Sequence, residues 1–214
     1  MKNFEGIIFD VDGTLTSTHE LICAAFNHVT SKYINKKLTN EEVFALYGPP
    51  ENTILKEWFG NNHSGAMEDY YKFYKDEHHL AEVYPGIKEI LKSIKEKNIP
   101  LGIFTGKGRR TTLITLEVLG LDKYFDLIVT GDDVKNHKPS GEGITKFINE
   151  FGLNKEKVLM IGDSVSDVKA SREAGIKIAS ALWDSYAGKK VKTLESNYYF
   201  HSVEELREFL YSMN

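Results

Sequence analysis

The strongest constraint on the fold is a set of five short apolar runs, each of which ends in polar or glycine-rich sequence. Short runs that are apolar almost throughout are typical of strands buried on both faces of a sheet. They cover residues 6–10, 101–106, 126–132, 158–163 and 176–180. Helical segments separate the later runs, and this alternation indicates parallel strands. From Tyr84 onward the chain is therefore expected to form a doubly wound, Rossmann-like α/β fold with a parallel sheet.

Two segments between these runs have the apolar spacing of a helix. The first follows Pro85 and ends before Pro100, and the second ends before Gly120, a residue typical of helix C-termini. Their apolar positions are Ile87, Ile90, Leu91 and Ile94 in the first, and Leu113, Leu116 and Leu119 in the second. Both helices are expected to cover a face of the sheet.

A long segment without such runs separates the first two predicted strands. Residues 17–83 far exceed the length that a βα crossover needs, and their apolar spacing indicates helices throughout. Examples are Leu21, Ala24, Ala25 and His28, and the stripe Met67, Tyr70, Tyr71 and Tyr74. We interpret the aromatic stripe as helix-packing core rather than a ligand site. The prediction is an all-helical cap at residues 17–83, inserted into a core made of residues 1–16 and 84–214.

Composition and charge exclude several classes of partner and location. The net charge is -4, so no basic excess favours nucleic acid or an anionic membrane. The only cysteine, Cys23, cannot form an internal disulfide, which suits a reducing compartment. The first apolar run is too short for a signal peptide, and none approaches the roughly 18 apolar residues of a membrane span. A cytoplasmic, soluble protein is expected, with no membrane or nucleic-acid partner.

Polar residues collect where the predicted strands end. Ligands bind at the carboxyl ends of the strands in an open parallel sheet, so side chains that follow different strands meet there. The residues at this edge are the four acids Asp10, Asp12, Asp163 and Asp167, the hydroxyl of Thr105 and the ammonium group of Lys138. Four clustered acids repel one another, and a divalent cation resolves that repulsion most simply. Oxygen ligands without histidine or thiolate favour Mg²⁺.

The same residues suit the transfer of a phosphoryl group. Lys138 and Thr105 are free to hold an anion that shares the metal, and phosphate fits that role. Asp10, at the end of a strand, is the better-placed nucleophile for an aspartyl-phosphate. Asp12 can give a proton to the leaving oxygen and later take one from water. The backbone N–H groups of residues 11–13 could form an anion-binding nest beside them.

Four short motifs in this order resemble those of the haloacid dehalogenase superfamily, and the resemblance covers nearly the whole chain. They are DVDGTL (10–15), FTGK (104–107), HKPS (137–140) and GDSVSD (162–167), the last followed by AGI (174–176). The helical insertion stands where that family has a type-1 cap, which closes over small substrates. The four motifs together with this cap are far more specific than any one of them.

The resemblance implies a role for each motif residue. Asp10 would be the nucleophile and Asp12 the general acid and base, while Lys138 would brace the nucleophile and the phosphoryl group. Thr105 and Gly106 would bind phosphate. The implied Mg²⁺ ligands are Asp10 through its side chain, Asp12 through its backbone carbonyl, and Asp163, with Asp167 in support.

Two further segments look most like the phosphoglycolate phosphatase and pyrophosphatase branch of that family: LYGPPENT (46–53) and VTGDDV (129–134). The chain also departs from the family pattern at two points. Ser17 stands where an acid is common, and Lys138 is followed by Pro-Ser-Gly where the family often has Pro-x-Pro. Neither departure removes a catalytic group, and both leave the substrate open.

The favoured function is a Mg²⁺-dependent phosphatase that acts on a small phosphorylated metabolite or on pyrophosphate. An alternative is a phosphomutase of the β-phosphoglucomutase type, in which a sugar hydroxyl replaces water. A phosphate-receiving signalling module also combines clustered aspartates, a hydroxyl and a lysine, but its acceptor would lie on a later strand. The oligomeric state does not follow from the sequence.

Several residues near these motifs have two interpretations each. Residues 47–50 are either a rigid substrate-contacting loop or a plain connection between helices, since paired prolines hold a turn. Arg109 and Arg110 either reach the substrate or lie on the surface, and the surface is favoured. His78 and His79 are adjacent on a helix and point in different directions, so they are not expected to share a metal.

Overall fold

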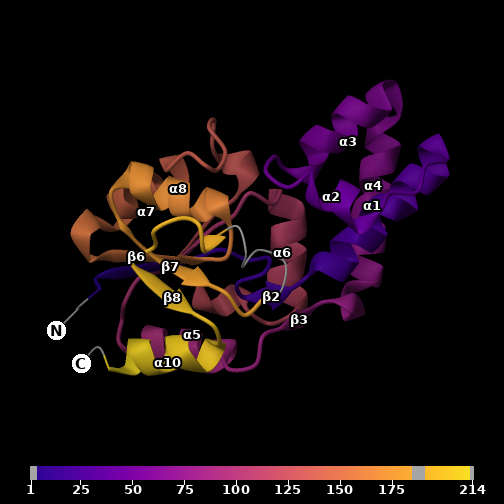
Figure 1. Ribbon diagram of the computed structural model, residues 1–214. Coiled ribbons are helices and arrows are strands. Elements are labelled where there is room, and N and C mark those ends of the chain that lie inside the picture. The colour runs from indigo at the N-terminus through magenta and orange to yellow at the C-terminus, as the bar shows by residue number, and fades with distance from the viewer. Residues whose placement is uncertain (1–3, 185–190, 213–214) are drawn as a thin grey trace.

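The computed structural model describes residues 4–184 and 191–212 and contains a six-stranded parallel sheet (Figure 1). The strand order is β5-β4-β1-β6-β7-β8, so β1 lies inside the sheet between β4 and β6. The strands are β1 (Gly6–Phe9), β4 (Leu101–Phe104), β5 (Leu127–Val129), β6 (Val158–Gly162), β7 (Lys177–Ala181) and β8 (Tyr198–Phe200). All five predicted runs form strands, and the doubly wound α/β fold is confirmed.

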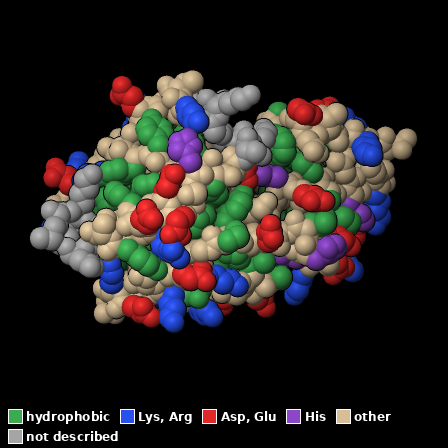
Figure 2. Space-filling view, turned by 60° about the horizontal axis from the view of Figure 1, so that its bottom comes forward, with side chains coloured by type: hydrophobic (Ala, Val, Ile, Leu, Met, Phe, Trp, Pro, Cys, Tyr) green, Lys and Arg blue, Asp and Glu red, His purple; other side chains and the backbone are tan. Residues whose placement is uncertain are grey.

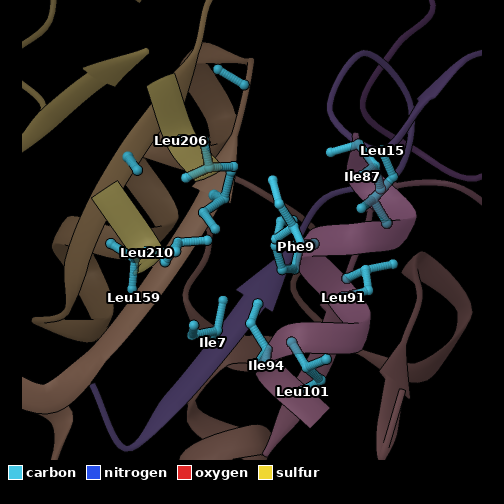
Figure 3. Close-up of a cluster of buried hydrophobic side chains, with 14 of the residues drawn as sticks. Ile7, Phe9, Leu15, Ile87, Leu91, Ile94, Leu101, Leu159, Leu206 and Leu210 are labelled. Carbon is cyan, nitrogen blue, oxygen red and sulfur yellow. The ribbon is translucent and has the colours of Figure 1, made fainter. Parts of the chain in front are cut away.

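Helices cover both faces of this sheet. On one face lie α5 (Ile87–Glu96) and α10 (Val203–Tyr211), and on the other lie α7 (Glu142–Phe151) and α8 (Val165–Ala174). Side chains of β1 alternate between the two resulting cores: Ile7 and Phe9 belong to one and Ile8 to the other. Figure 3 shows Ile7 and Phe9 between the apolar residues of α5 and those of α10. Continuous apolar sequence in β1 is thus required because both faces are covered.

The first predicted helix is confirmed by its burial. The four apolar positions of α5 are at most 4% exposed, and Figure 3 shows three of them against β1. Beyond residue 181, β8 and α10 were not predicted, because β8 is only three residues long and carries no clear periodicity. Its last residue pairs with Ala181 of β7, so the sheet extends one strand further than the apolar runs indicated.

The apolar face predicted for the second helix is wrong in part. In α6 (Arg109–Val118), Leu116 is buried, but Leu113 is 41% exposed. Threonines are buried there instead, and the hydroxyl of Thr115 lies 2.9 Å from that of Tyr74. The reason is that α6 contacts the inserted helical segment as well as the sheet, and polar side chains serve that second contact.

The inserted segment is a bundle of helices at one end of the molecule, on the far side of the sheet from both chain ends (Figure 1). Its helices are α1 (His19–Ile34), α2 (Asn40–Phe44), α3 (Glu51–Phe59) and α4 (His63–Asp76). They enclose a hydrophobic cluster that contains Tyr70, Tyr71 and Tyr74, so the aromatic stripe is packing core. Tyr70 also lines a cavity described below.

The expectation that residues 17–83 are wholly helical is wrong at both ends. There β2 (Thr16–Ser17) and β3 (Glu82–Val83) pair antiparallel, so the chain enters and leaves the bundle through a two-stranded ribbon. The short strands lacked a sequence signal, since two residues show no periodicity. The predicted domain boundaries fall in or beside this ribbon, and the division into a core and a cap stays an interpretation.

The distribution of charged side chains on one face of the molecule agrees with the net charge of the chain. On the face shown in Figure 2, acidic and basic side chains are interspersed and form no basic patch. Within residues 4–184 and 191–212, no helix combines the length and the apolar character that crossing a membrane requires.

Candidate active site

The sheet brings the predicted site residues to one edge. Asp10, Thr105 and Asp163 each follow directly after a strand, namely β1, β4 and β6. Strand β1 pairs with both neighbours in register, with Phe9 opposite Ile103 and Ile161. The three polar side chains therefore emerge side by side at the carboxyl ends of three central strands.

Three of the four predicted acids form a compact cluster. Carboxylate oxygens of Asp10, Asp163 and Asp167 lie within 4.8 Å of one another. All three residues are buried, with at most 8% exposure. Lys138 is also buried, and its Nζ lies 3.0 Å from Asp10 Oδ1 and 2.5 Å from Asp167 Oδ1. One ammonium group is thus paired with two of the three acids, and ionisation of all three would leave an excess of negative charge.

The pKa values of these residues reflect burial and the crowding of negative charge. Burial, together with the charges of Asp167 and Asp12, raises the pKa of Asp10 to about 6, although Lys138 opposes the shift. Burial and the charges of Asp10 and Asp167 raise the pKa of Asp163 well above its usual value. Burial acts against the charge on Lys138, but the carboxylates of Asp10 and Asp167 outweigh it and raise the pKa of Lys138. An additional cation would therefore be bound favourably here.

Local sequence holds two of these acids in place. Ser164 and Asp167 form a capping box at the start of α8, in which the Asp167 carboxylate accepts hydrogen bonds from the Ser164 N–H and hydroxyl. A Cβ on Gly13 would lie 2.6 Å from Asp163 Oδ2, and Gly13 has a φ of +79°. Glycine is therefore required at position 13, both for the backbone conformation and for the space beside Asp163.

The cluster fits a magnesium ion. Its donors are all carboxylate oxygens, the ligands that Mg²⁺ prefers, and neither histidine nor thiolate is in the group. Asp163 accepts a hydrogen bond from the Thr14 hydroxyl at 3.2 Å and has no lysine or arginine within ion-pair distance among the described residues. A divalent cation would compensate the charge that Lys138 leaves unpaired.

The fourth acid, Asp12, points elsewhere. Its carboxylate accepts hydrogen bonds from Lys107 Nζ at 2.9 and 3.2 Å and from the hydroxyl of Thr18. Burial acts against the ionised form, but the Lys107 charge and these hydrogen bonds prevail and lower the pKa of Asp12. Asp12 thus lines the same cavity at the same edge of the sheet, but its carboxylate lies outside the compact cluster of the other three acids.

Sequence reasoning missed Lys107 as a functional residue. Its ammonium group is buried with only 6% side-chain exposure, lies 4.8 Å from the centre of the Tyr74 ring, and pairs with Asp12. The available signal was its position in FTGK, two residues after Thr105 at a strand end. Its backbone N–H also donates to the Thr105 hydroxyl at 3.3 Å, so Thr105 and Lys107 belong to one turn.

This turn also carries the two residues that were predicted to bind phosphate. Thr105 is 2% exposed and lines the cavity together with Gly106. A Cβ on Gly106 would lie 3.0 Å from the carbonyl oxygen of Gly48, so the loop after α2 approaches this turn closely. The anion-binding nest predicted for residues 11–13 has one donor fewer, because the N–H of Gly13 already donates to the Thr16 carbonyl.

A cavity of about 580 Å³ lies between the sheet edge and the helical bundle, a size common for small-molecule sites. The acids Asp10, Asp12 and Asp163, with Thr105 and Lys138, line it from the core. Residues 47–49 line it from the bundle, which favours the interpretation of that loop as a substrate contact.

A second buried acid, Glu51, was also missed. It stands at the start of α3 and accepts hydrogen bonds from the Gly108 N–H at 2.9 Å and from the Thr111 hydroxyl at 2.8 Å. Burial is the main reason that the pKa of Glu51 is raised. No sequence signal could have shown this contact, because its partners lie 57 and 60 residues away.

The remaining candidates behave as surface or packing residues. Arg109 pairs with Asp133 at 2.7 Å, and Arg110 pairs with Glu68 of α4 at 2.5 Å. His78 is buried, whereas His79 is largely exposed, so the two do not share a site.

Comparisons with known proteins agree with this geometry. A sequence profile described as haloacid dehalogenase-like hydrolase matches residues 7–181. The pyrophosphatase PpaX of Halalkalibacterium halodurans is 32% identical, with 95% of each chain aligned. PpaX of Bacillus cereus strain B4264 is 31% identical, with 97% of each chain aligned. The predicted resemblance to the pyrophosphatase branch is therefore confirmed.

Solved structures show the same fold. A provisionally named beta-phosphoglucomutase from Thermotoga maritima superposes with a TM-score of 0.76 at 30% identity, covering 98% of this chain and all of the other. CbbY from Rhodobacter sphaeroides, solved with phosphate, gives a TM-score of 0.83 at 20% identity over 95% of this chain and 96% of the other.

Proposed function

The chain belongs to the haloacid dehalogenase-like hydrolases, and from that premise we propose that it is a Mg²⁺-dependent phosphatase that forms an aspartyl-phosphate on Asp10. One observation carries the proposal. At the end of β1, the Asp10 carboxylate lies in a buried cluster with two further acids and Lys138, and this cluster opens into a cavity. The substrate would be a small phosphorylated metabolite or pyrophosphate.

The proposed reaction has two steps. An oxygen of Asp10 attacks phosphorus, and the bond from phosphorus to the leaving oxygen breaks as that oxygen takes a proton from Asp12. In the second step water attacks the aspartyl-phosphate, and Asp12 takes the proton that water loses. The ion pair with Lys107 holds Asp12 ionised, which suits the second step. Asp12 must take up a proton before the first step, so this pair must loosen when substrate binds.

The other residues hold the phosphoryl group. Lys138, Thr105 and Gly106 line the same cavity as Asp10 and would bind the equatorial phosphoryl oxygens. Asp10, Asp163 and the backbone carbonyl of Asp12 would hold the Mg²⁺ ion, with Asp167 in support. When bound, the ion would neutralise charge on the transferred group.

The domain organisation and location belong to the same proposal. Residues 17–83 would act as a cap over a core made of residues 1–16 and 84–214 and would exclude bulk water during turnover. A hydrophobic cluster of its own supports treating the cap as a unit. The single cysteine supports a cytoplasmic location, and the net charge of -4, with interspersed charges on the face shown in Figure 2, supports a small-molecule substrate rather than a nucleic acid.

A phosphomutase is the second candidate, because the solved relative at 30% identity carries that name. It would use the same aspartyl-phosphate and pass the group to a sugar hydroxyl. A signalling receiver is less well supported, since its acceptor would lie on a later strand than β1. Product analysis separates the candidates: free phosphate indicates a phosphatase, and an isomerised sugar phosphate indicates a mutase.

The test is phosphate release from a panel of small phosphate esters and pyrophosphate. It is run with Mg²⁺, with EDTA, and with the Asp10→Asn variant, whose fold is checked by circular dichroism. We expect turnover that requires the metal and is absent from the variant. Phosphate release by a folded Asp10→Asn enzyme would refute the nucleophile assignment.

A further inference from the structure

The cavity has two chemically different sides. The core contributes the aspartates, Thr105 and the buried lysines, whereas the cap side is mainly apolar and aromatic. The cap side chains that form this apolar wall are Ile22, Phe26, Phe44, Leu46, Ile54 and Tyr70. Phe26 and Tyr70 are at most 3% exposed and meet edge to face, with ring centres 5.2 Å apart. These two rings, with the buried Ile22 and Ile54, give the wall a packed centre, whereas Phe44 and Leu46 are partly buried.

The lysines that line the cavity all come from the core, within residues 4–184 and 191–212. Lys107 pairs with Asp12, and Lys138 pairs with Asp10 and Asp167. Lys169 is exposed and stands on α8, the helix that also carries Asp167. Lys107 and Lys138 are thus held in existing ion pairs, and Lys169 belongs to the core rather than to the cap wall.

Besides tyrosines, the cap contributes one acidic side chain and one histidine to the cavity lining, and both already have partners. Glu51 is an acid and accepts hydrogen bonds from Gly108 and Thr111. His19 lies between Tyr47, 2.9 Å from its hydroxyl, and Asp184, 3.5 Å from its carboxylate. Among the described residues, the cap contributes no lysine or arginine to the cavity.

This wall constrains the group that leaves. With the phosphoryl group at Asp10, the leaving group extends toward the cap. A second phosphate or a carboxylate would lose hydration there without gaining a cation, which is costly. An apolar group would instead remove its own surface and that of the wall from water.

We propose that the preferred substrate is a phosphate monoester whose leaving alcohol is uncharged and apolar, of the size of a branched alkyl or aryl group. Pyrophosphate and esters with a carboxylate on the leaving group are disfavoured. The inference rests on the proposed phosphatase function and selects the substrate class within it. Pyrophosphate, the substrate that the name of the relatives implies, would then not be the preferred substrate of this chain.

A matched pair of substrates tests this directly. Isobutyl phosphate and phosphoglycolate have leaving groups with the same number of non-hydrogen atoms, but one ends in two methyl groups and the other in a carboxylate. We expect kcat/KM for isobutyl phosphate to exceed that for phosphoglycolate and for pyrophosphate by about tenfold or more. In the series of methyl, ethyl and propyl phosphate, kcat/KM should rise about fourfold per added methylene.

A positive charge placed on the apolar wall should weaken or cancel this preference. Leu46 is half-buried and lines the cavity, so Leu46→Arg adds a cation where an anionic leaving group would lie. The matched control is Leu113→Arg, at a position that is 41% exposed on α6 and outside the cavity lining. We expect the ratio of phosphoglycolate to isobutyl phosphate turnover to rise about tenfold in Leu46→Arg and to stay at the wild-type value in the control.

The possible outcomes distinguish failure of the substrate proposal from failure of the proposed phosphatase function. A wild-type enzyme that hydrolyses phosphoglycolate or pyrophosphate as well as isobutyl phosphate overturns the inference and leaves the phosphatase standing. An unchanged ratio in folded Leu46→Arg also overturns it. Failure to hydrolyse any of these phosphates refutes the phosphatase itself. The wild-type comparison decides the matter even if the arginine variant does not fold.

Discussion

Replacing Lys138 with methionine removes the one cation that contacts the acidic cluster among the described residues. The ammonium group is 3% exposed and lies 3.0 Å from Asp10 and 2.5 Å from Asp167. Removal of one partner from a buried ion pair typically costs about 3–5 kcal/mol, because a charge stays buried without compensation. Methionine keeps most of the volume, so a cavity adds little. We expect the free energy of unfolding to fall by about 3–5 kcal/mol near neutral pH in EDTA.

The loss should depend on pH in a defined direction. The pKa of Asp10 is raised to about 6 from an ordinary 3.8, so its contribution favours folding most below 3.8 and is lost as the pH rises through 6. Lys138 opposes this shift, and without it the pKa of Asp10 rises further. The difference between wild type and variant should therefore grow as the pH rises above about 6.

Urea unfolding provides the assay, since Trp58 in the cap and Trp183 in the core both report by fluorescence. Mg²⁺ at a hundred times its Kd should return about 2.7 kcal/mol to the variant, because the ion replaces the missing positive charge. The control is Lys72→Met, which removes an exposed lysine paired with Asp76 and should leave unfolding unchanged. A loss below about 1 kcal/mol for Lys138→Met in EDTA would refute the buried ion-pair reasoning.

Three further predictions follow from single contacts. Lys107→Met removes the partner that orients the general acid and should lower kcat about tenfold to a hundredfold in steady-state phosphate release; unchanged kcat would remove its positioning role. Burial raises the pKa of Glu51, so its ionisation costs stability as the pH rises. The stability of Glu51→Gln relative to wild type should therefore increase from acidic to neutral pH, and urea unfolding that shows no such increase contradicts this. Gly13→Ala should abolish the stabilisation by Mg²⁺, measured as a shift in Tm, because its Cβ displaces Asp163, whereas Gly120→Ala, with a φ of +65° and open space, should keep it.

The core of the fold could be predicted because its signals are local. The strand apolarity reflects burial on both faces, as Ile7 and Ile8 show by facing opposite cores. The position of Asp10 after β1 follows from the same logic. Motif spacing then places Asp163 beside it, because adjacent parallel strands end at the same edge.

The parts that could not be predicted depend on contacts between distant segments. Glu51 contacts Gly108 only because the cap docks against α6. Leu113 is exposed for the same reason, since α6 presents threonines to the cap. The orientation of Asp12 away from the other acids depends on Lys107, which lies 95 residues later. Local periodicity contains no information about such pairings.

The central claim is that a covalent phosphoryl group forms on Asp10, and mass spectrometry tests it most directly. The Asp12→Ala variant, which lacks the base for the second step, is mixed with Mg²⁺ and a hydrolysed aryl phosphate, whose leaving phenolate needs no proton from Asp12, and is then quenched in acid and digested. The account predicts phosphate on Asp10 and none in Asp10→Asn treated in the same way. Phosphate on another residue, or turnover by wild type without any phosphorylated peptide, would contradict it.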